Sequence, residues 1–212
     1  MKKIILILAI AISVVACKVD SKNKTEVSEV EQVTVSDESS ALTVDSQNSL
    51  VEWKGFKPTG SHNGTISIYE GVLNISSDVL IGGRFTIDMN SIVNLDVEDI
   101  VYKAKLVAHL KSEDFFDVES FPKVKFEITK VNEVEDKLNI SGNLTAKGIT
   151  KNITIPATLT KQDGVVTLRS DPFKIDRTEF GIQYNSDKFF ENLKDKSIDD
   201  LFELSFVVLT NK

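Results

Sequence analysis

The side chains that most often carry catalysis are scarce in this chain. His62 and His109 are its only histidines, and Cys17 is its only cysteine. No nucleophile-elbow pattern marks a serine that could work with either histidine, and a zinc site needs several nitrogen or sulfur ligands. The acidic run at residues 96–99 lacks the glycine and the ligand spacing of a calcium loop. We therefore expect no enzyme, no metal site and no cofactor.

The charge balance excludes a second class of function. The chain has 25 Lys and Arg against 32 Asp and Glu, which gives a formal net charge of −7. Nucleic-acid phosphates require a basic protein face. We therefore expect no nucleic-acid partner.

The segment His109–Ile128 indicates an apolar ligand instead. A polar lead is followed by the pair Phe115-Phe116 between acidic residues, then by Phe121-Pro122 and an alternating strand. This order predicts a short helix or turn that closes over an apolar space, and a strand that faces into it. The two phenylalanines could plug or line such a space, or they could only seal a helix onto the sheet. We expect packing for at least one ring and a mixed role for the segment.

Alternation of apolar and polar residues predicts the strands that form this space. The inward positions of six runs are Ile66 and Ile68; Phe85, Ile87 and Met89; Val124, Phe126 and Ile128; Leu138, Ile140, Gly142 and Leu144; Ile153, Ile155, Ala157 and Leu159; Phe202, Leu204, Phe206 and Val208. A period of two is typical of antiparallel sheets that have one face against the core and one face exposed to solvent. The predicted turns lie at residues 61–64, 81–83, 135–136, 147–148 and 162–164.

Two stretches, residues 97–116 and 186–198, interrupt the alternation. Residues 187–194 have the pattern of a short amphipathic helix, with Ser186 or Asp187 as its cap. The expected fold class is therefore all-β: an eight-stranded antiparallel barrel with one or two short helices. A two-sheet sandwich is the alternative.

The N-terminal residues carry a targeting pattern. Lys2 and Lys3 precede an apolar run, Ile4–Ala16, which is shorter than the roughly 20 residues of a membrane-spanning helix. This is typical of a signal peptide over residues 1–16. Val14–Cys17 resembles the lipobox of bacterial lipoproteins, so we expect acylation of Cys17 and a membrane-anchored lipoprotein of the bacterial envelope, at the periplasmic face or the cell surface. Ordinary cleavage beside an unmodified thiol is the alternative.

Domain organisation follows from the change in composition after Cys17. Residues 17–41 are polar and contain no aromatic side chain, which predicts a lipidated N-terminus followed by a flexible linker. Residues 42–212 suit one domain.

Four segments of that domain resemble the YceI-like family of bacterial envelope proteins. They are Leu110–Asp117, Phe121–Phe126, Gly142–Lys151 and Ile175–Ile182, and the resemblance extends from Val44 to the C-terminus. It implies an eight-stranded, lipocalin-like antiparallel barrel with an elongated apolar cavity for long isoprenoid or acyl-type lipids, and a homodimer. Residues 55–64 depart from the family's commoner first strands, which leaves the ligand more open than the fold.

The residues themselves also favour a cavity. An eight-stranded barrel can enclose its own side chains or one small ligand. Bulky inward residues such as Phe126 alternate here with small ones such as Gly142 and Ala157, which could leave a channel; a filled core is the alternative. The predicted cavity residues are Phe85, Ile87, Phe115, Phe116, Phe126, Ile128, Leu144, Ile155, Phe180 and Phe206.

A lipid head group needs donors or cations near the mouth of the cavity. The predicted head-group residues are Arg84, Lys103, Lys105, His109 and Arg177. For Arg177, an ion-paired strand corner is the preferred interpretation, and His109 could equally be a surface histidine. The function hypothesis is an envelope-anchored lipoprotein that binds a long-chain apolar ligand for storage, transport or sensing. The alternative is a non-catalytic structural or interaction domain displayed on the envelope.

Overall fold

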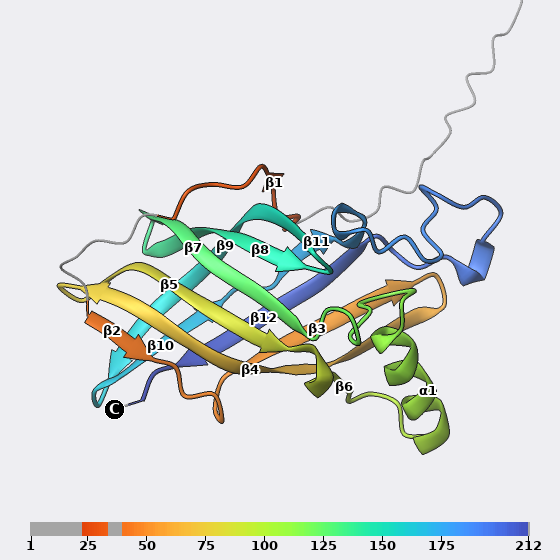
Figure 1. Ribbon diagram of the computed structural model, residues 1–212, viewed down its shortest axis with the longest axis horizontal. Helices are drawn as coiled ribbons and strands as arrows, with labels where there is room; N and C mark the ends of the chain where they lie inside the picture. Colours follow the sequence, from red (N-terminus) through yellow and green to blue (C-terminus); the bar gives the residue numbers. More distant parts are fainter. Residues whose placement is uncertain (1–22, 34–39, 212) are drawn as a thin grey trace, which may run out of the picture.

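The computed structural model describes residues 23–33 and 40–211; the predicted signal peptide and Cys17 lie outside the described residues. Eight antiparallel strands form a closed barrel in the order β9-β10-β12-β3-β4-β5-β7-β8, and β8 pairs with β9 (Figure 1). Their bounds are β3 (Leu50–Lys57), β4 (Gly60–Ser76), β5 (Val79–Asp88), β7 (Lys123–Val134), β8 (Lys137–Ala146), β9 (Ile149–Gln162), β10 (Val165–Ser170) and β12 (Leu201–Leu209). The predicted barrel is confirmed, and the β8–β9 pairing excludes the sandwich.

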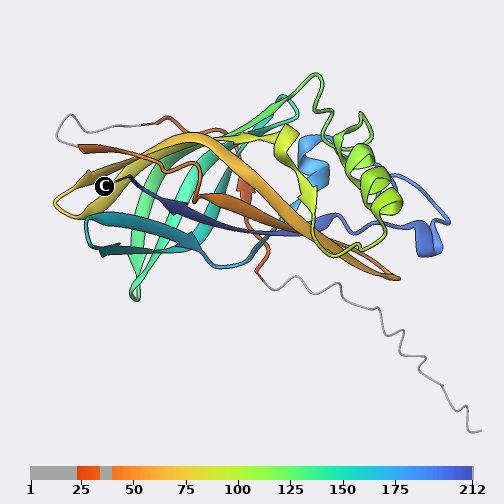
Figure 2. The ribbon, with the colours of Figure 1, turned by 90° about the horizontal axis from the view of Figure 1, so that it is seen from below.

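Four short strands of the described chain extend this sheet. They are β1 (Val27–Ser28) on β9, β2 (Ser40–Thr43) and β6 (Val93–Asn94) on β4, and β11 (Phe173–Asp176) on β12. Figure 2 shows the helix α1 (Ile100–Lys111) and the loops before β12 at one end of the barrel, with β2 and the β4–β5 hairpin at the other. The alternating residues pack between these ends: the main core cluster includes Ile68, Phe85, Phe126, Ile140 and Ile155.

Three of the five predicted turns are present. The backbone has positive φ at Glu135 and Asp136, at Lys147 and Gly148, and at Asp163 and Gly164. These are the left-handed conformations that tight hairpins need. Each turn joins two strands that pair antiparallel, as their short separation predicted.

The other two predicted turns are wrong, because their glycines serve close packing between strands. Residues 61–64 lie inside β4 and residues 81–83 inside β5. A Cβ at Gly64 would lie 1.8 Å from the carbonyl oxygen of Val93, and a Cβ at Gly83 would lie 2.7 Å from the carbonyl oxygen of Val72. Glycine within a strand often marks such a close approach of another backbone.

One α-helix, α1, forms in the first interrupted stretch. Asp99 caps it, since its carboxylate accepts a hydrogen bond from the Tyr102 N–H at 2.8 Å. No helix in the described residues is both long and apolar enough to cross a membrane.

The predicted helix at residues 187–194 is absent. The Ser186 carbonyl accepts hydrogen bonds from Phe189 N–H and Phe190 N–H, but φ is positive at Asn192 and Lys194, and a short 3-10 turn, η3 (Lys194–Lys196), follows. Both phenylalanine side chains are about half exposed (48% and 49%). An apolar face without packing cannot stabilise so short a helix.

The polar N-terminal stretch also differs from its prediction. Residues 24–31 lie on the barrel wall, where Val27 and Ser28 pair with Ile153 and Asn152 of β9. Thr25 is only 4% exposed. The flexible-linker interpretation is therefore wrong for these residues, because backbone pairing holds a segment that has too few apolar side chains to predict packing.

Candidate ligand-binding cavity

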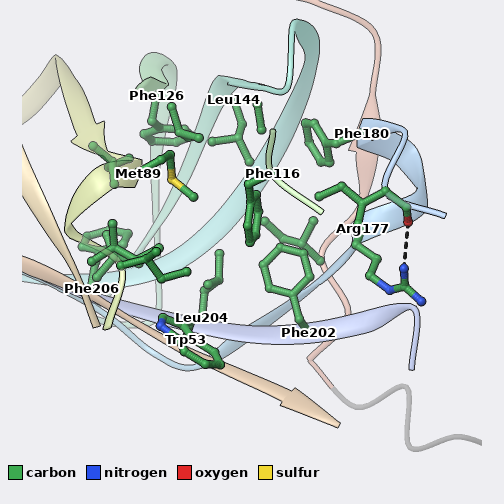
Figure 3. Close-up of a pocket in the computed structure, with 18 of the residues that line it drawn as sticks. Trp53, Met89, Phe116, Phe126, Leu144, Arg177, Phe180, Phe202, Leu204 and Phe206 are labelled. Carbon is green, nitrogen blue, oxygen red and sulfur yellow. Dashed lines mark hydrogen bonds between the residues drawn. The ribbon is translucent and has the colours of Figure 1, made fainter. Parts of the chain in front are cut away.

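The barrel encloses an apolar cavity of about 170 Å³ (Figure 3). Most of its wall comes from the inward faces of β3, β4, β5, β7, β8, β9, β11 and β12. The end of α1 and the loop after it, the 3-10 turns η1 (Met89–Ser91) and η2 (Arg177–Phe180), and the loop before β12 supply the rest. Arg177 and Asp199 are the only charged residues among those that line it. An engineered apolar cavity of about 150 Å³ in another protein stays dry and binds benzene. This space is therefore suited to hydrocarbon.

Nine of the ten predicted cavity residues lie together on this wall. They are Phe85, Ile87, Phe115, Phe116, Phe126, Leu144, Ile155, Phe180 and Phe206. Ile128 is buried at 2% exposure but is not among the lining residues. Its Cδ1 would lie 3.4 Å from a Cβ at Gly83, so its side chain fills the space over that glycine in the solid part of the core.

Aromatic rings dominate the cavity wall. Phe85 and Phe126, opposite each other on β5 and β7, stack with centroids 6.5 Å apart and an angle of 7°. In Figure 3 the ring of Phe116 projects between the Phe126 side of the cavity and the Phe180 side. Phe116 therefore occupies part of the space between these two groups of lining residues.

Phe115 has a packing role as well as a place in the cavity wall. Its ring meets His109 edge-on at 5.0 Å and Tyr184 at 5.5 Å, and His109 meets Tyr184 at 4.7 Å. His109 Nε2 lies 3.1 Å from Asp114 Oδ2. The ring cluster ties the end of α1 to the loop at Tyr184, so His109 does not line the cavity and its head-group role is not supported.

Three other predicted head-group residues also lie away from the cavity wall. Arg84 is exposed on β5, because the alternation that turns Phe85 inward turns its neighbour outward. Lys103 and Lys105 lie on α1, from which only Leu110 reaches the cavity lining among the described residues.

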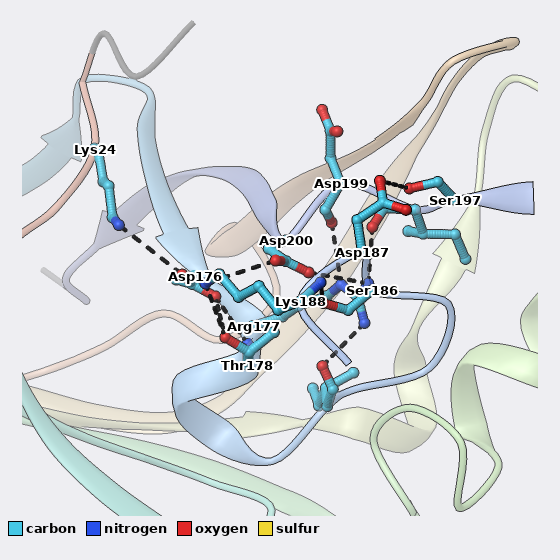
Figure 4. Close-up of polar contacts among 12 residues, drawn as sticks. Lys24, Asp176, Arg177, Thr178, Ser186, Asp187, Lys188, Ser197, Asp199 and Asp200 are labelled. Atoms are coloured by element: carbon cyan, nitrogen blue, oxygen red, sulfur yellow. Dashed lines mark hydrogen bonds and ion pairs between the residues drawn. The ribbon is translucent and has the colours of Figure 1, made fainter. Parts of the chain in front are cut away.

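Arg177 lines the cavity, but its guanidinium is committed to the backbone (Figure 4). Its Nε donates to the Asp199 carbonyl at 3.0 Å, Nη1 to the Ile182 carbonyl at 2.9 Å and Nη2 to the Ile198 carbonyl at 2.8 Å. Burial lowers the pKa of Arg177 below its ordinary value, and the nearby Asp200 carboxylate, 3.4 Å from Nη2, opposes that shift. The geometry matches the ion-paired corner interpretation.

A carboxylate next to this arginine completes the corner. Asp176 Oδ2 lies 2.6 Å from Lys188 Nζ, and its Oδ1 accepts hydrogen bonds from the Thr178 N–H and hydroxyl. Burial would raise the pKa of Asp176, but the Lys188 and Thr178 hydrogen bonds lower it below 3.8. We call Asp176, Arg177, Thr178, Lys188 and Asp200 the polar corner. The sequence prediction missed Lys188 and Asp200, because nothing in the local pattern links them to Arg177.

The sequence prediction also missed part of the cavity wall. Trp53 and Gly55 on β3 and Phe173 and Ile175 on β11 all line the cavity. Both strands alternate, as in Val51, Trp53 and Gly55, so the same period-two signal could have found them.

The described parts of the chain hold no group of three or more His, Cys, Asp and Glu side chains arranged to bind a metal.

A sequence profile of the YceI-like domain matches residues 42–209. Protein YceI of Salmonella arizonae is 36% identical over 88 residues, which is 38% of this chain and 46% of that protein. The proteins of the same name from Salmonella newport and Salmonella agona match to the same extent. The chain thus spans about half the length of the curated relatives it matches.

Two solved structures share the fold. BcnA of Burkholderia cenocepacia superposes with a TM-score of 0.63 at 20% identity, covering 79% of this chain and 99% of BcnA. A polyisoprenoid binding domain from Saccharophagus degradans, implicated in plant cell wall breakdown, superposes with a TM-score of 0.57 at 14% identity, covering 79% of this chain and 95% of that domain. At these identities the likeness establishes the architecture.

Proposed function

Since this chain belongs to the YceI-like domain family, we propose that its barrel binds an elongated apolar ligand, an isoprenoid or acyl-type lipid. The observation that carries the proposal is the cavity of about 170 Å³ whose lining is apolar except for Arg177 and Asp199. The polyisoprenoid-binding domain with the same fold supports this ligand class. A module for display alone needs no such space, so the cavity disfavours that alternative.

Binding by this cavity requires no covalent chemistry. Removal of a hydrocarbon tail from water contributes about 25 cal/mol per Å² of buried apolar surface, before the cost of ordering the ligand. The lining is apolar except for Arg177 and Asp199, and the Arg177 guanidinium already donates to three backbone carbonyls, so few groups are left to select a head group by hydrogen bonds. Selectivity would therefore come from chain length and shape.

A long ligand requires the Phe116 side chain to move. The cavity volume of about 170 Å³ is close to that of the cavity that holds a single benzene ring. Phe116 is only half-buried and lies in the loop after α1, outside the barrel strands. Rotation of its ring out of the cavity would enlarge the space for a ligand without any change in strand pairing.

The proposal includes export and anchoring of the protein through acylated Cys17. The first described residue, Asn23, follows Cys17 by six residues, and six residues span at most about 21 Å. Such a tether would hold the barrel close to the membrane that supplies or receives the lipid. Storage, transport and sensing, and a homodimer, remain predictions. Anchoring is tested by fractionation, in which Cys17→Ala should move the protein from the membrane to the soluble fraction.

The ligand proposal is tested with the purified full chain. The protein is loaded with geranylgeraniol or oleate, separated from free lipid and extracted with organic solvent. Mass spectrometry should find about one lipid per protein molecule, and competition between the two loaded lipids ranks isoprenoid against acyl chains. Absence of stoichiometric lipid from both preparations would contradict the proposal.

A further inference from the structure

The barrel wall has a seam between β9 and β11. At one end β9 pairs with β10, where Arg169 faces Thr158 and Ser170 faces Ala157. If β11 continued that register, Lys174 would face Ile153. The two strands do not pair, because Asp171-Pro172 redirects the chain and β11 pairs on its other side with β12. A proline cannot donate to the sheet, and strands commonly stop pairing there.

The N-terminal segment fills this seam. Val27 and Ser28 pair antiparallel with Ile153 and Asn152 of β9, while Lys24 forms a parallel bridge with Lys174 of β11. The Thr25 N–H donates to the Lys174 carbonyl at 2.8 Å, and the Lys174 N–H donates to the Asn23 carbonyl at 2.9 Å. We call residues 23–31 the strap. Figure 1 shows β1, its central part, along the wall that contains β9 and β11.

Both sides of the seam belong to the cavity wall. Ile153 and Ile155 of β9 and Phe173 and Ile175 of β11 all line the cavity. Val27 of the strap packs against the same hydrophobic cluster. Displacement of the strap would therefore open a slot in the side of the barrel that leads to the cavity.

The outer face of the barrel carries a docking site for the end of the strap. The Asn143 amide pairs with the backbone of Glu31: its Oδ1 accepts from the Glu31 N–H at 3.1 Å and its Nδ2 donates to the Glu31 carbonyl at 2.7 Å. Asn152, its cross-strand neighbour, donates to Asn143 Oδ1 at 3.0 Å and to the Thr129 hydroxyl at 3.1 Å. Both asparagines are buried although they face outward.

The docking of the strap has one weak point. The Thr25 hydroxyl is buried and has no hydrogen-bond partner. A buried polar group without a partner destabilises the arrangement that buries it. Backbone hydrogen bonds and Asn143 hold the strap against this penalty, together with a Thr129–Glu31 hydrogen bond and the Lys24–Asp176 and Lys151–Glu29 ion pairs. Each ion pair has an exposed partner, and such pairs contribute little, so the strap is easier to displace than a barrel strand that pairs along its whole length.

We propose that the strap is a displaceable strand of the barrel wall that gates lateral passage of the apolar ligand between the cavity and the membrane. This inference rests on the proposed lipid-binding function. The strap begins six residues after the predicted acylation site at Cys17. Tension between the membrane anchor and the barrel would therefore act first on the strap residues that pair with β11. The membrane-proximal part of the chain thereby controls access to the cavity.

A reversible cross-link tests the gate. Ser28 and Asn152 are direct cross-strand partners, and such pairs lie about 4.5–5.5 Å apart at Cα, within the range for a disulfide. Ser28→Cys with Asn152→Cys, in a full chain that also carries Cys17→Ala, should lock the strap when oxidised. Stopped-flow fluorescence with cis-parinaric acid should show association and dissociation at least tenfold slower than after reduction, with an unchanged Kd.

A matched disulfide controls for cross-linking itself. Thr145 and Thr150 face each other across β8 and β9, and their hydroxyls lie 2.8 Å apart. Thr145→Cys with Thr150→Cys joins two strands that are already paired, so oxidation should leave both rates unchanged. Equal rates in the oxidised and reduced Ser28/Asn152 variant would overturn the gate. Failure of every form to bind the probe would instead refute the proposed function.

Two single substitutions should shift the rates in opposite directions. Thr25→Val replaces the unpartnered hydroxyl by a methyl group of similar size, which strengthens docking and should slow release of cis-parinaric acid about threefold. Asn143→Ala removes both hydrogen bonds to Glu31 and should speed release by a similar factor. Identical release rates in the two folded variants would contradict control by the strap.

Discussion

The cavity wall and the polar corner share Arg177, but they differ in how far their side chains already have partners within the protein. In the corner the Arg177 guanidinium donates to three backbone carbonyls, and the Asp176 carboxylate accepts hydrogen bonds from Lys188 and Thr178. In the cavity the side chains face open space, and a Cβ built at Gly55 would meet no atom within 4 Å. The side chains of Asp176 and Arg177 are already engaged by partners within the protein, whereas the cavity leaves apolar surface for a ligand to contact.

This difference separates structural from ligand-binding residues more clearly than residue type does. Arginine is a usual candidate for a lipid head group, yet here it fixes the segments at Ile182 and at Ile198–Asp200. The phenylalanines, for which the sequence predicted a cavity lining with a filled core as the alternative, surround the open volume. Substitutions in the corner should therefore change stability, and substitutions in the cavity should change binding.

The largest expected effect is at the corner. Arg177→Met leaves Asp200 without its buried partner and three carbonyls without their donor, which should lower the free energy of unfolding by about 3–5 kcal/mol. Urea denaturation measures this loss in the free energy of unfolding. Arg84→Met, at an exposed position on β5, is the matched control and should change stability by no more than about 0.5 kcal/mol. Equal losses in the two variants would contradict the structural role of Arg177.

Adding one methyl group at Gly64 or at Gly55, on the paired strands β4 and β3, tests whether the space beside each glycine is filled or open. Gly64→Ala places Cβ 1.8 Å from the Val93 carbonyl oxygen, and such overpacking should cost about 1–3 kcal/mol. Gly55→Ala meets no atom within 4 Å and should be neutral or slightly stabilising. Thermal unfolding of both variants checks the contrast, and a destabilised Gly55→Ala would show that this part of the cavity is filled.

Substitution of Phe116 should affect both stability and ligand binding. Because its side chain is half-buried and borders the cavity, Phe116→Ala should cost about 1–2 kcal/mol, below the roughly 3–5 kcal/mol of a fully buried phenylalanine. The enlarged cavity should bind geranylgeraniol more tightly, as measured by displacement of cis-parinaric acid. Weaker binding with an intact fold would mean that the ring holds the ligand rather than limiting the space.

The smallest expected effect is a pH dependence outside the cavity. Burial would raise the pKa of Asp96, but hydrogen bonds from the Asn63 N–H, His62 and Asn94 lower it from 3.8 to about 2. A lowered folded-state pKa stabilises the protein above pH 3.8, and that stabilisation is lost as the pH falls toward 2. Asp96→Asn should therefore reduce the loss of stability between pH 4 and pH 2. An unchanged pH profile by urea denaturation would contradict the hydrogen-bonded carboxylate.

The sequence could predict the inward face of the barrel because alternation encodes it directly. The same rule places Arg84 outside, next to inward-facing Phe85, so its position away from the cavity wall could also have been predicted from the sequence. The partners of Arg177 could not be predicted, because they are backbone carbonyls brought together by the fold.

Two further features had no readable signal. The polar composition of the strap predicted a linker, because composition does not show the backbone pairing with β9, the Asn143 hydrogen bonds or the ion pairs that hold it. The glycines at 64 and 83 predicted turns, but they make room for the backbone of a neighbouring strand, at Val93 and at Val72. Composition describes what a segment can bury, whereas these positions depend on what the rest of the chain places beside them.

The most direct test of the cavity is to fill it without removing any core side chain. Gly55 shares its face of β3 with Val51 and Trp53, which both line the cavity. Gly55→Phe should place a ring in the open volume, and Gly55→Ala is the matched control. Titration with cis-parinaric acid should give stoichiometric binding for the unsubstituted chain and for Gly55→Ala, and at least tenfold weaker binding for a folded Gly55→Phe. Equal binding by all three proteins would contradict a ligand site inside the barrel.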